Sequence, residues 1–490
     1  PLFPHGIRIH ITSAKTDGSY IRFTRRMMEE FGVEAVFDGC DYMVQAAGGY
    51  QRSGYQIEPD VSGACYFYAA AAITGGRALV KHVHKDNSQG DMKFLDVLAQ
   101  TYMSYRLANI TEYQAAVNYM YTNDKVKSLI ESIWSKAYNN IANCNNIIQR
   151  IESESAGKFA GGETEQKMIE GEALALRAYL HFDMLRLFAP SMFKKDERQY
   201  IPYVTTYPCT FQPYSTNKEV LEKAIEDLKR AKMLVEPFDM AETKWLITKN
   251  RIEGDESPTD LFYAYRGYRM NYYAISALLA RVYNYAGMHQ EAFDEATTVI
   301  EAKGSGGKFF TMSTSGDVTN GNIKLYDNVI FCLSNQNLWT IYEPYYNTDQ
   351  SLVLAAWDIT DIFDAINDTR AQLVKLENSQ IYSIKNLPTQ AKLASYVKDM
   401  IPMIRLGEMY YIRAEYYNSK EDDTNAKNEL AILRSAYNCP PDKLTGDFVD
   451  ELINEVHREY LGEGQLFYYY KKMNKRPGYA MGSDDLFVLP

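Results

Sequence analysis

Residues 171–188 read GEALALRAYLHFDMLRLF, and this stretch decides the fold. Its leucine, alanine and aromatic residues recur at helical spacing. The pattern predicts one long helix over residues 165–189. Pro190 follows directly and ends that helix, because a proline ring cannot continue the helical hydrogen bonding.

The neighbouring segments on both sides also have helical periodicity. An apolar stripe from Val126 to Ile151 predicts a preceding helix of about 25 residues. Residues 217–234 form a third predicted helix, which begins after the capping residues Ser215 and Thr216. We expect it to end before Pro237.

Two pairs of helices follow. Residues 270–286 pair with 289–302, and residues 403–418 pair with 426–436. In the first pair, small residues stand where the two helices must approach, as in tetratricopeptide units. The fold class is therefore predicted as mainly α: a tetratricopeptide-like scaffold of helical pairs with long loops between them. Such loops commonly carry the function of a helical scaffold.

The first 98 residues have a different pattern. Strands alternate there with helical segments, which is typical of βαβ units, so we predict a small N-terminal α/β fragment. Tyrosine is sparse in this part, with six of the forty tyrosines of the chain. We expect two domains, an α/β fragment at 1–98 and a helical-repeat domain at 99–490. The predicted strands are 7–12, 34–37, 42–46, 55–58 and 77–83, and the predicted helices are 19–31, 62–73 and one from residue 92.

The composition excludes several classes of function. The 490 residues are 46% hydrophobic and 23% charged, as in globular proteins. The net charge of −11 argues against nucleic acid and anionic lipid as ligands. The six cysteines include no CxxC motif, so neither a zinc site nor a disulfide framework is predicted. There is no apolar run of about 18 residues. We expect no metal and no cofactor.

Four ordered motifs after residue 100 resemble the SusD/RagB family. The stretch quoted above resembles the hallmark helix of that family, and residues 134–145 resemble its preceding helix. Residues 405–415 (RLGEMYYIRAE) and 455–465 (EVHREYLGEGQ) match two further segments, which completes the four motifs. In addition, residues 487–490 resemble the start of the family's closing segment. The resemblance implies an outer-membrane, surface-exposed, glycan-binding lipoprotein that caps a TonB-dependent, SusC-like transporter. We expect the N-terminal segment of the family, with its signal and lipid-bearing cysteine, to be missing here.

The first hundred residues resemble EPSP synthase, the 3-phosphoshikimate 1-carboxyvinyltransferase. The resemblance is carried by residues 55–72, by Gln89, Gly90 and Asp91, and by residues 19–33. It covers a fragment of such an enzyme. Of the family's contacts with shikimate phosphate, it implies a counterpart at Tyr20 alone. We therefore interpret the chain as a chimera whose first part is catalytically inactive.

The best predicted binding loop follows the strand at 329–333. It is dense in aromatic, amide and acidic residues without helical periodicity, as expected where rings stack on sugars and polar groups bind hydroxyls. In the SusD/RagB family a segment after this strand contributes to the glycan site. The expected glycan-binding residues of the loop are Trp339, Tyr342, Tyr345, Tyr346, Asn335, Asn337 and Asn347, and we expect its four rings to line an exposed groove.

Three other groups of residues have alternative interpretations. Trp245 is a second possible ligand-binding residue, and Trp357 is expected in the core beside residues 352–356. Arg177 and His181 share a helix face, for which a structural role is favoured over a catalytic one. No catalytic set of residues is recognisable.

The predicted function is therefore a non-catalytic glycan-binding component of an outer-membrane nutrient uptake system. Its expected partners are an oligosaccharide or polysaccharide and the transporter, and nucleic acid is not among them. The first alternative is carboxyvinyl transfer by residues 1–98. The second is a tetratricopeptide module that binds a different protein partner.

Overall fold

The computed structural model divides the chain into two compact units. One comprises a small N-terminal sheet, and the other comprises the helical body, which contains every described residue from 90 onward. The residues that the structure describes are 7–10, 28, 33–38, 41–44, 90–107, 109–254, 262–346, 348–386, 393–478 and 487–489.

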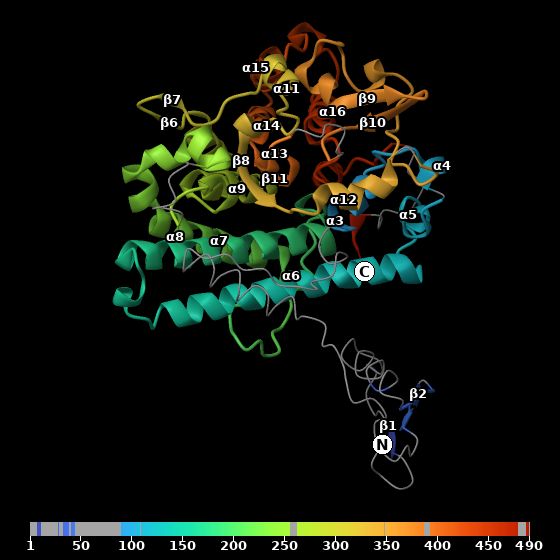
Figure 1. The fold of residues 1–490 in the computed structure, drawn as a ribbon, viewed down its shortest axis with the longest axis vertical. Coiled ribbons are helices and arrows are strands. Elements are labelled where there is room, and N and C mark those ends of the chain that lie inside the picture. The colour runs from blue at the N-terminus through green and yellow to red at the C-terminus, as the bar shows by residue number, and fades with distance from the viewer. Residues whose placement is uncertain are drawn as a thin grey trace. The chain divides into compact units, whose positions relative to one another are not determined.

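Three long helices form one side of the helical body (Figure 1). They are α6 (Asp124–Ile151), α7 (Gly162–Phe188) and α8 (Asn217–Ala241), and each packs against the next. The middle helix α7 is buried around most of its circumference, since the consecutive residues Ala173, Leu174 and Ala175 are all in the core. These helices confirm the long helices predicted from the sequence.

Paired shorter helices continue the scaffold. The pair α9 (Tyr272–Tyr285) and α10 (His289–Ile300) packs against the pair α14 (Leu406–Ser419) and α15 (Asp423–Ala436) through contacts of α10 and α9 with α14. The predicted fold, a mainly α scaffold of helical pairs, is confirmed.

One helix end differs from the prediction. The helix α8 begins at the capping box of Thr216 and Glu219, as expected, but it continues through Pro237 instead of ending before it. A proline at this position leaves the carbonyl of Met233 without its helical donor. Met233 is exposed, so water can reach that carbonyl and the helix can continue.

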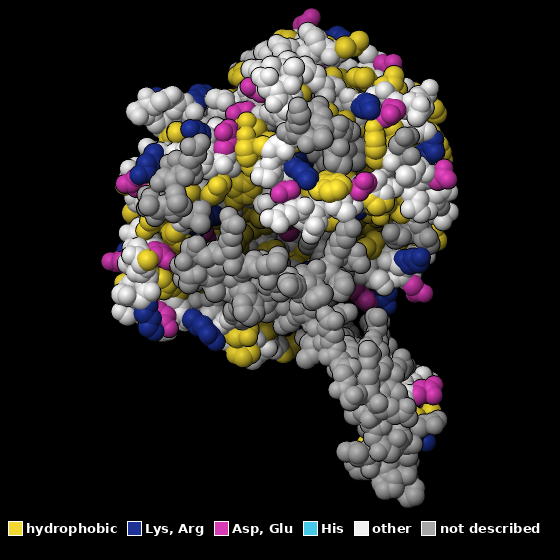
Figure 2. Space-filling model, viewed as in Figure 1, with side chains coloured by type: hydrophobic (Ala, Val, Ile, Leu, Met, Phe, Trp, Pro, Cys, Tyr) yellow, Lys and Arg dark blue, Asp and Glu magenta, His cyan; other side chains and the backbone are white. Residues whose placement is uncertain are grey.

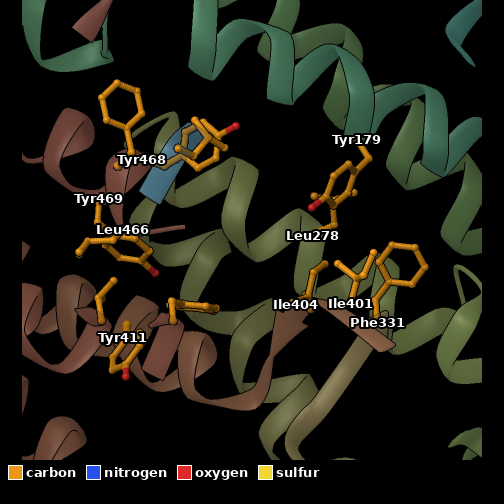
Figure 3. Packing of buried hydrophobic residues seen from close by; sticks show 14 of the residues in the cluster. Tyr179, Leu278, Phe331, Ile401, Ile404, Tyr411, Leu466, Tyr468 and Tyr469 are labelled. Carbon is orange, nitrogen blue, oxygen red and sulfur yellow. The ribbon is translucent and has the colours of Figure 1, made fainter. Parts of the chain in front are cut away.

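A two-stranded antiparallel sheet lies within the helical body. Its strands are β8 (Val329–Ser334), as predicted, and β11 (Met400–Arg405), and Leu333 is paired with Ile401. Figure 3 shows the hydrophobic packing around this sheet, where Tyr179 of α7 lies 6.2 Å from the ring of Phe331 and close to Leu278 of α9. Ser334 ends β8 and is paired with Met400 of β11, and the predicted binding loop starts from it.

Shorter elements surround these helices. The body also contains the helices α3 (Gly90–Leu98), α4 (Ser104–Leu107), α5 (Thr111–Ala116), α11 (Ser315–Thr319), α12 (Leu338–Tyr342), α13 (Ser395–Lys398), α16 (Phe448–Tyr460) and α17 (Leu466–Lys472). Three pairs of short strands complete it: β4 (Gln199–Ile201) with β5 (Ser215–Thr216), β6 (Lys303–Gly304) with β7 (Gly307–Lys308), and β9 (Val374–Glu377) with β10 (Gln380–Ser383).

The helix α3 was expected in the N-terminal fragment, but its side chains pack within the helical body. Phe94, Val97 and Leu98 are fully buried, and α3 contacts α5 and α17. The backbone N–H of Gly464 donates to the Asp96 carboxylate at 3.1 Å. This helix therefore belongs structurally to the helical body.

The N-terminal unit contains a three-stranded sheet in the order β1–β3–β2. Its strands are β1 (Ile7–His10), β2 (Ala35–Phe37) and β3 (Asp41–Val44), and β3 is antiparallel to both neighbours. The strands β1 and β2 are thus parallel to each other, as in the predicted βαβ unit, but β3 is inserted between them. The other predicted elements before residue 90 lie outside the described residues.

Candidate functional site

The predicted binding loop is attached firmly to the sheet. The backbone N–H of Asn335 donates to the Asp399 carbonyl at 2.7 Å, and the side chain of Asn335 accepts from the N–H of Asn337 at 2.8 Å. Leu338 then enters the core and begins α12. The side-chain oxygen of Asn335 therefore stabilises a turn of the backbone at 335–337, while Asn337 is exposed to solvent.

The rings of Tyr342 and Tyr345 meet at a buried lysine. The Nζ of Lys93 lies 4.3 Å from the ring centroid of Tyr345 and 5.2 Å from that of Tyr342, and it donates to the Ile341 carbonyl at 3.5 Å. Tyr345 is half-buried, but Tyr342 is only 4% exposed. The expectation of an exposed groove lined by all four rings is therefore wrong for Tyr342, because this ring is buried in the hydrophobic core.

Tyr346 belongs to a polar cluster with the β9–β10 hairpin. Its hydroxyl donates to Glu377 and accepts from the Nζ of Lys375 at 3.2 Å. Its ring contacts Tyr382 edge to face, with centroids 5.0 Å apart. Burial and then the Glu377 carboxylate raise the pKa of Tyr346, so its hydroxyl stays protonated at neutral pH. The hairpin thus fixes this half-buried ring at the surface.

The three tryptophans near the predicted sites have different surroundings. Trp339 is half-buried, with the Nζ of Lys398 4.9 Å from its ring, and Figure 2 shows hydrophobic side chains at the surface near α12. Trp245 is only 5% exposed, so its ring has no free face for a ligand. Trp357, expected in the core, is 79% exposed. The Asp361 carboxylate accepts from the N–H groups of Trp357 and Asp358, and this turn directs the chain outward. Asn347 and Tyr20 lie outside the described residues.

An open hollow of about 510 Å³ lies beside Tyr346 and Tyr382. Asn109, just after α4, joins this hollow to the predicted loop, since its side chain donates to the Asp349 carbonyl at 2.9 Å. Three segments that are far apart in sequence therefore meet here. The lining residues are Arg106, Thr348, Asp349, Asn378, Gln380 and Tyr382.

The polar groups of the hollow suit hydroxyl ligands. Within the described ranges Arg106 has no ion-pair partner, and its Nε is buried without a hydrogen bond. The Asp349 side chain is exposed in the same hollow. Guanidinium groups only donate, carboxylates only accept and amides do both, so together they match the donors and acceptors of sugar hydroxyls.

Sequence reasoning missed four of these residues, namely Arg106, Asn378, Gln380 and Tyr382, which lie outside the predicted binding loop. Arg106 comes from a four-residue helix with no clear pattern. Asn378 and Ser379 form the tight turn between β9 and β10, where both have positive φ angles, and Gln380 follows as the first residue of β10. A turn asparagine was a usable signal for the hairpin, but nothing in the sequence placed the hairpin next to residue 348.

The residues Arg177 and His181 have structural roles. The Nε and Nη2 atoms of Arg177 donate to the two oxygens of Asp227 at 2.8 and 2.6 Å, and its Nη1 donates to Asn145. The ring of His181 stacks on Tyr203, with centroids 3.9 Å apart. The structural interpretation of this motif is consistent with these contacts.

The later motifs also contribute buried ion pairs. Glu463 accepts from Arg405 at 2.6 Å and from Lys385 at 2.7 Å, and Glu455 accepts from Arg370 and Arg434. Burial opposes ionisation of Glu463, but Arg405 and Lys385 outweigh it and lower its pKa. The Arg405–Glu463 pair joins the segment after α16 to the end of β11, and the Arg434–Glu455 pair joins α15 to α16. Across the described residues, no group of three histidine, cysteine or acidic side chains could hold a metal ion. Within the same residues no helix is both long and apolar enough to cross a membrane.

Three family profiles match the chain. The SusD family matches residues 187–468, and a family described as starch-binding associating with outer membrane matches residues 77–250. The EPSP synthase family matches residues 1–135.

Two relatives found by sequence are each matched over about a fifth of this chain. The 3-phosphoshikimate 1-carboxyvinyltransferase of Nostoc punctiforme is 49% identical over 83 residues, which are 17% of this chain and 20% of the enzyme. That of Cronobacter sakazakii is 39% identical over 100 residues, or 20% and 23% of the two chains. The chain thus spans about a fifth of the length of the curated relatives it matches.

Solved structures resemble the larger part in fold. A SusD-like carbohydrate binding protein from Bacteroides vulgatus has a TM-score of 0.60 at 16% identity, over 83% of each chain. A SusD superfamily protein from Bacteroides thetaiotaomicron has a TM-score of 0.55 at 22% identity, over 72% of this chain and 77% of that one. A laminarin binding SusD-like protein has a TM-score of 0.56 at 16% identity, over 82% and 91%.

Proposed function

The chain belongs to the SusD family, and from this premise we propose that its helical body binds a glycan, without catalysis, in the hollow beside Tyr346. One observation carries the proposal. Arg106 and Asp349 line the same hollow without forming an ion pair with each other, next to the amides of Asn378 and Gln380. A guanidinium donor and a carboxylate acceptor that do not pair with each other at an open surface are suited to an uncharged, hydroxyl-rich ligand.

Half-buried rings supply the stacking surface of this proposed site. Tyr345, Tyr346 and Trp339 retain some exposure and are each fixed by a neighbouring lysine. We propose these rings, with Asn337 and Asn347, as ligand contacts. The buried residues Tyr342 and Trp245 are not proposed as stacking surfaces, and Asn335 supports the turn.

The partners follow from the family. SusD family proteins associate with the outer membrane, so we propose a surface location there and a TonB-dependent, SusC-like transporter as the protein partner. The division into domains at 1–98 and 99–490 stays a proposal. The helix α3 (Gly90–Leu98) precedes that boundary in the sequence, but it packs against helices of the second domain.

The test is glycan affinity of the full chain, measured by titration calorimetry. Laminarin is the first probe, because a protein of the same fold is named for binding it. Arg106→Ala should weaken binding about tenfold, since it removes charged donors to the sugar hydroxyls. Arg198→Ala is the matched control, because this arginine is exposed and its partners among the described residues are Asp196 and Tyr200 near β4. Equal losses in both variants, or in neither, would reject the hollow as the site.

A further inference from the structure

A second hollow, of about 290 Å³, is lined by the end of α11, by the turn that follows it and by α13. It has no described lining residue in common with the hollow beside Tyr346. Figure 1 shows α13 apart from α4 and from the β9–β10 hairpin, which line that first hollow. The two hollows are therefore separate places on the helical body.

Two tyrosine rings form the aromatic part of the second hollow. Tyr326 and Tyr396 meet edge to face, with their centroids 5.6 Å apart. Both rings are half-buried and pack against a small group of buried residues that includes Val329 and Met400 of the sheet. An edge-to-face pair covers the face of only one of its rings. Because both rings are also partly exposed, ring surface remains on which a sugar can stack.

The backbone beside both rings is fixed by hydrogen bonds. The side-chain oxygen of Asn322 accepts from the backbone N–H of Tyr326 at 2.9 Å, and the amide nitrogen of Asn322 donates to the Asp327 carboxylate at 2.7 Å. The Tyr268 hydroxyl donates to the Tyr396 carbonyl at 3.3 Å. The rings are therefore held in position before a ligand arrives, which lowers the entropic cost of binding.

The polar side chains of the second hollow are uncharged. The Asn320 side chain is exposed, and it has no hydrogen-bond partner among the described residues. The Thr319 hydroxyl donates to the Ser315 carbonyl at 2.9 Å, so its oxygen can still accept. The Tyr326 hydroxyl lies 3.5 Å from the Glu253 carboxylate, whose charge would repel an anionic ligand. These groups therefore favour a neutral ligand that both donates and accepts hydrogen bonds.

The helix α13 also reaches Trp339, which the proposed function treats as a ligand contact. Tyr396 and Lys398 are two positions apart on this short helix, and the Nζ of Lys398 lies 4.9 Å from the centre of the Trp339 ring. A further stacking ring therefore lies near the second hollow.

We propose that the second hollow is an additional carbohydrate-binding site, in which a neutral sugar unit stacks on Tyr396 while Asn320 binds its hydroxyls. An amide donates and accepts, as sugar hydroxyls do. The volume is close to the lower limit of about 300 Å³ for small-molecule pockets, so it suits a ligand as small as one sugar unit. The proposal goes beyond the hollow beside Tyr346 and does not depend on Arg106.

The test is calorimetric titration of the full chain with laminarin, cellohexaose, mannohexaose and xylohexaose. It is made in the Arg106→Ala variant, in which the first hollow is weakened. Adding Asn320→Ala should weaken the remaining binding about tenfold, through the loss of hydrogen bonds to the sugar. Adding Tyr396→Ala should have a similar effect through the loss of a stacking ring. Ser395→Ala is the matched control, because this residue is exposed on the same helix and does not line the hollow.

The outcomes separate the two hollows. Losses in both the Asn320 and the Tyr396 variants, with none in Ser395→Ala, would support the second hollow. If Asn320→Ala leaves the affinity unchanged, the second hollow is rejected, even if Tyr396→Ala lowers the affinity, because this tyrosine also packs against buried residues. Complete loss of binding in Arg106→Ala alone would likewise reject the second hollow and leave the first standing. A chain that binds none of the four probes would reject both.

Discussion

His181 of α7 is fully buried, and both of its ring nitrogens are engaged. Its Nδ1 donates to the Arg177 carbonyl at 2.9 Å, and its Nε2 accepts from the Val204 N–H at 2.9 Å. A proton on Nε2 would break the second bond. Burial is the main reason that the pKa of His181 is lowered to about 3, and burial likewise lowers that of His457 to about 4.

The lowered pKa values of His181 and His457 predict how the stability of the helical body depends on pH. Below the ordinary histidine pKa of 6.5, the unfolded chain takes up protons that the folded chain does not. The free energy of unfolding of the helical body should therefore fall as the pH falls from 6.5 toward 4, by about 1.4 kcal/mol per pH unit for each histidine. In urea titrations across this range, His181→Gln should lower the slope by one such contribution. An unchanged slope would contradict the prediction.

The tryptophans give the second prediction at this scale. Trp339→Ala should weaken oligosaccharide binding about tenfold through the loss of one stacking ring. The melting temperature should change little, because the ring is half-exposed. Calorimetric titration and thermal melting measure the two effects.

Trp357→Ala is the control for that experiment, since this ring is exposed on a different loop. We expect it to leave the affinity unchanged. The reverse result, with loss of binding in Trp357→Ala alone, would move the site to the turn at 357–361.

At the scale of elements, the packing of α7 on α8 depends on Gly171. A Cβ atom at this position would lie 2.8 Å from the Cγ1 of Val235 and 3.0 Å from the carbonyl oxygen of Ala231. The second of these is backbone, so it can move only if the helices separate.

Gly171→Ala should therefore lower the free energy of unfolding by about 1–3 kcal/mol, as overpacking does elsewhere. This exceeds the gain of up to about 1 kcal/mol in helix propensity from glycine to alanine. Denaturant unfolding measures it. Gly157→Ala is the matched control, because the nearest atom to its added Cβ would be Ser155 Oγ at an ordinary 3.7 Å. A destabilisation of the same size in both variants would contradict the argument.

The elements also show what the sequence could predict. Apolar periodicity located α6, α7 and the paired helices, because a helix that packs on a core must repeat its contacts every turn. The hollow could not be predicted in this way. It is formed by α4, the loop after β8 and the β9–β10 hairpin, and no local pattern encodes their meeting. Trp357 was assigned to the core from its apolar neighbours, whereas one carboxylate, that of Asp361, directs the chain outward.

At the scale of the whole molecule, two unrelated families match the two parts of one chain. The enzyme relatives are matched over about a fifth of their length. Catalysis depends on reacting groups held together in the right geometry, and about four fifths of the length of these enzymes is not matched here.

We therefore predict no carboxyvinyl transfer by the full chain. Shikimate-3-phosphate and phosphoenolpyruvate should release phosphate no faster with the protein than without it. Release above that blank, lost in Tyr20→Phe, would contradict the prediction and assign activity to the first part of the chain.

The burial of α7 has one more consequence, which concerns hydrogen exchange. Its backbone amides lie between α6 and α8 and are covered around most of the helix. A local opening of one neighbour exposes only one side, so the central α7 amides should exchange with deuterium only when the helical body unfolds as a whole. Their exchange rates would then report the global free energy of unfolding directly, from the native protein and without denaturant.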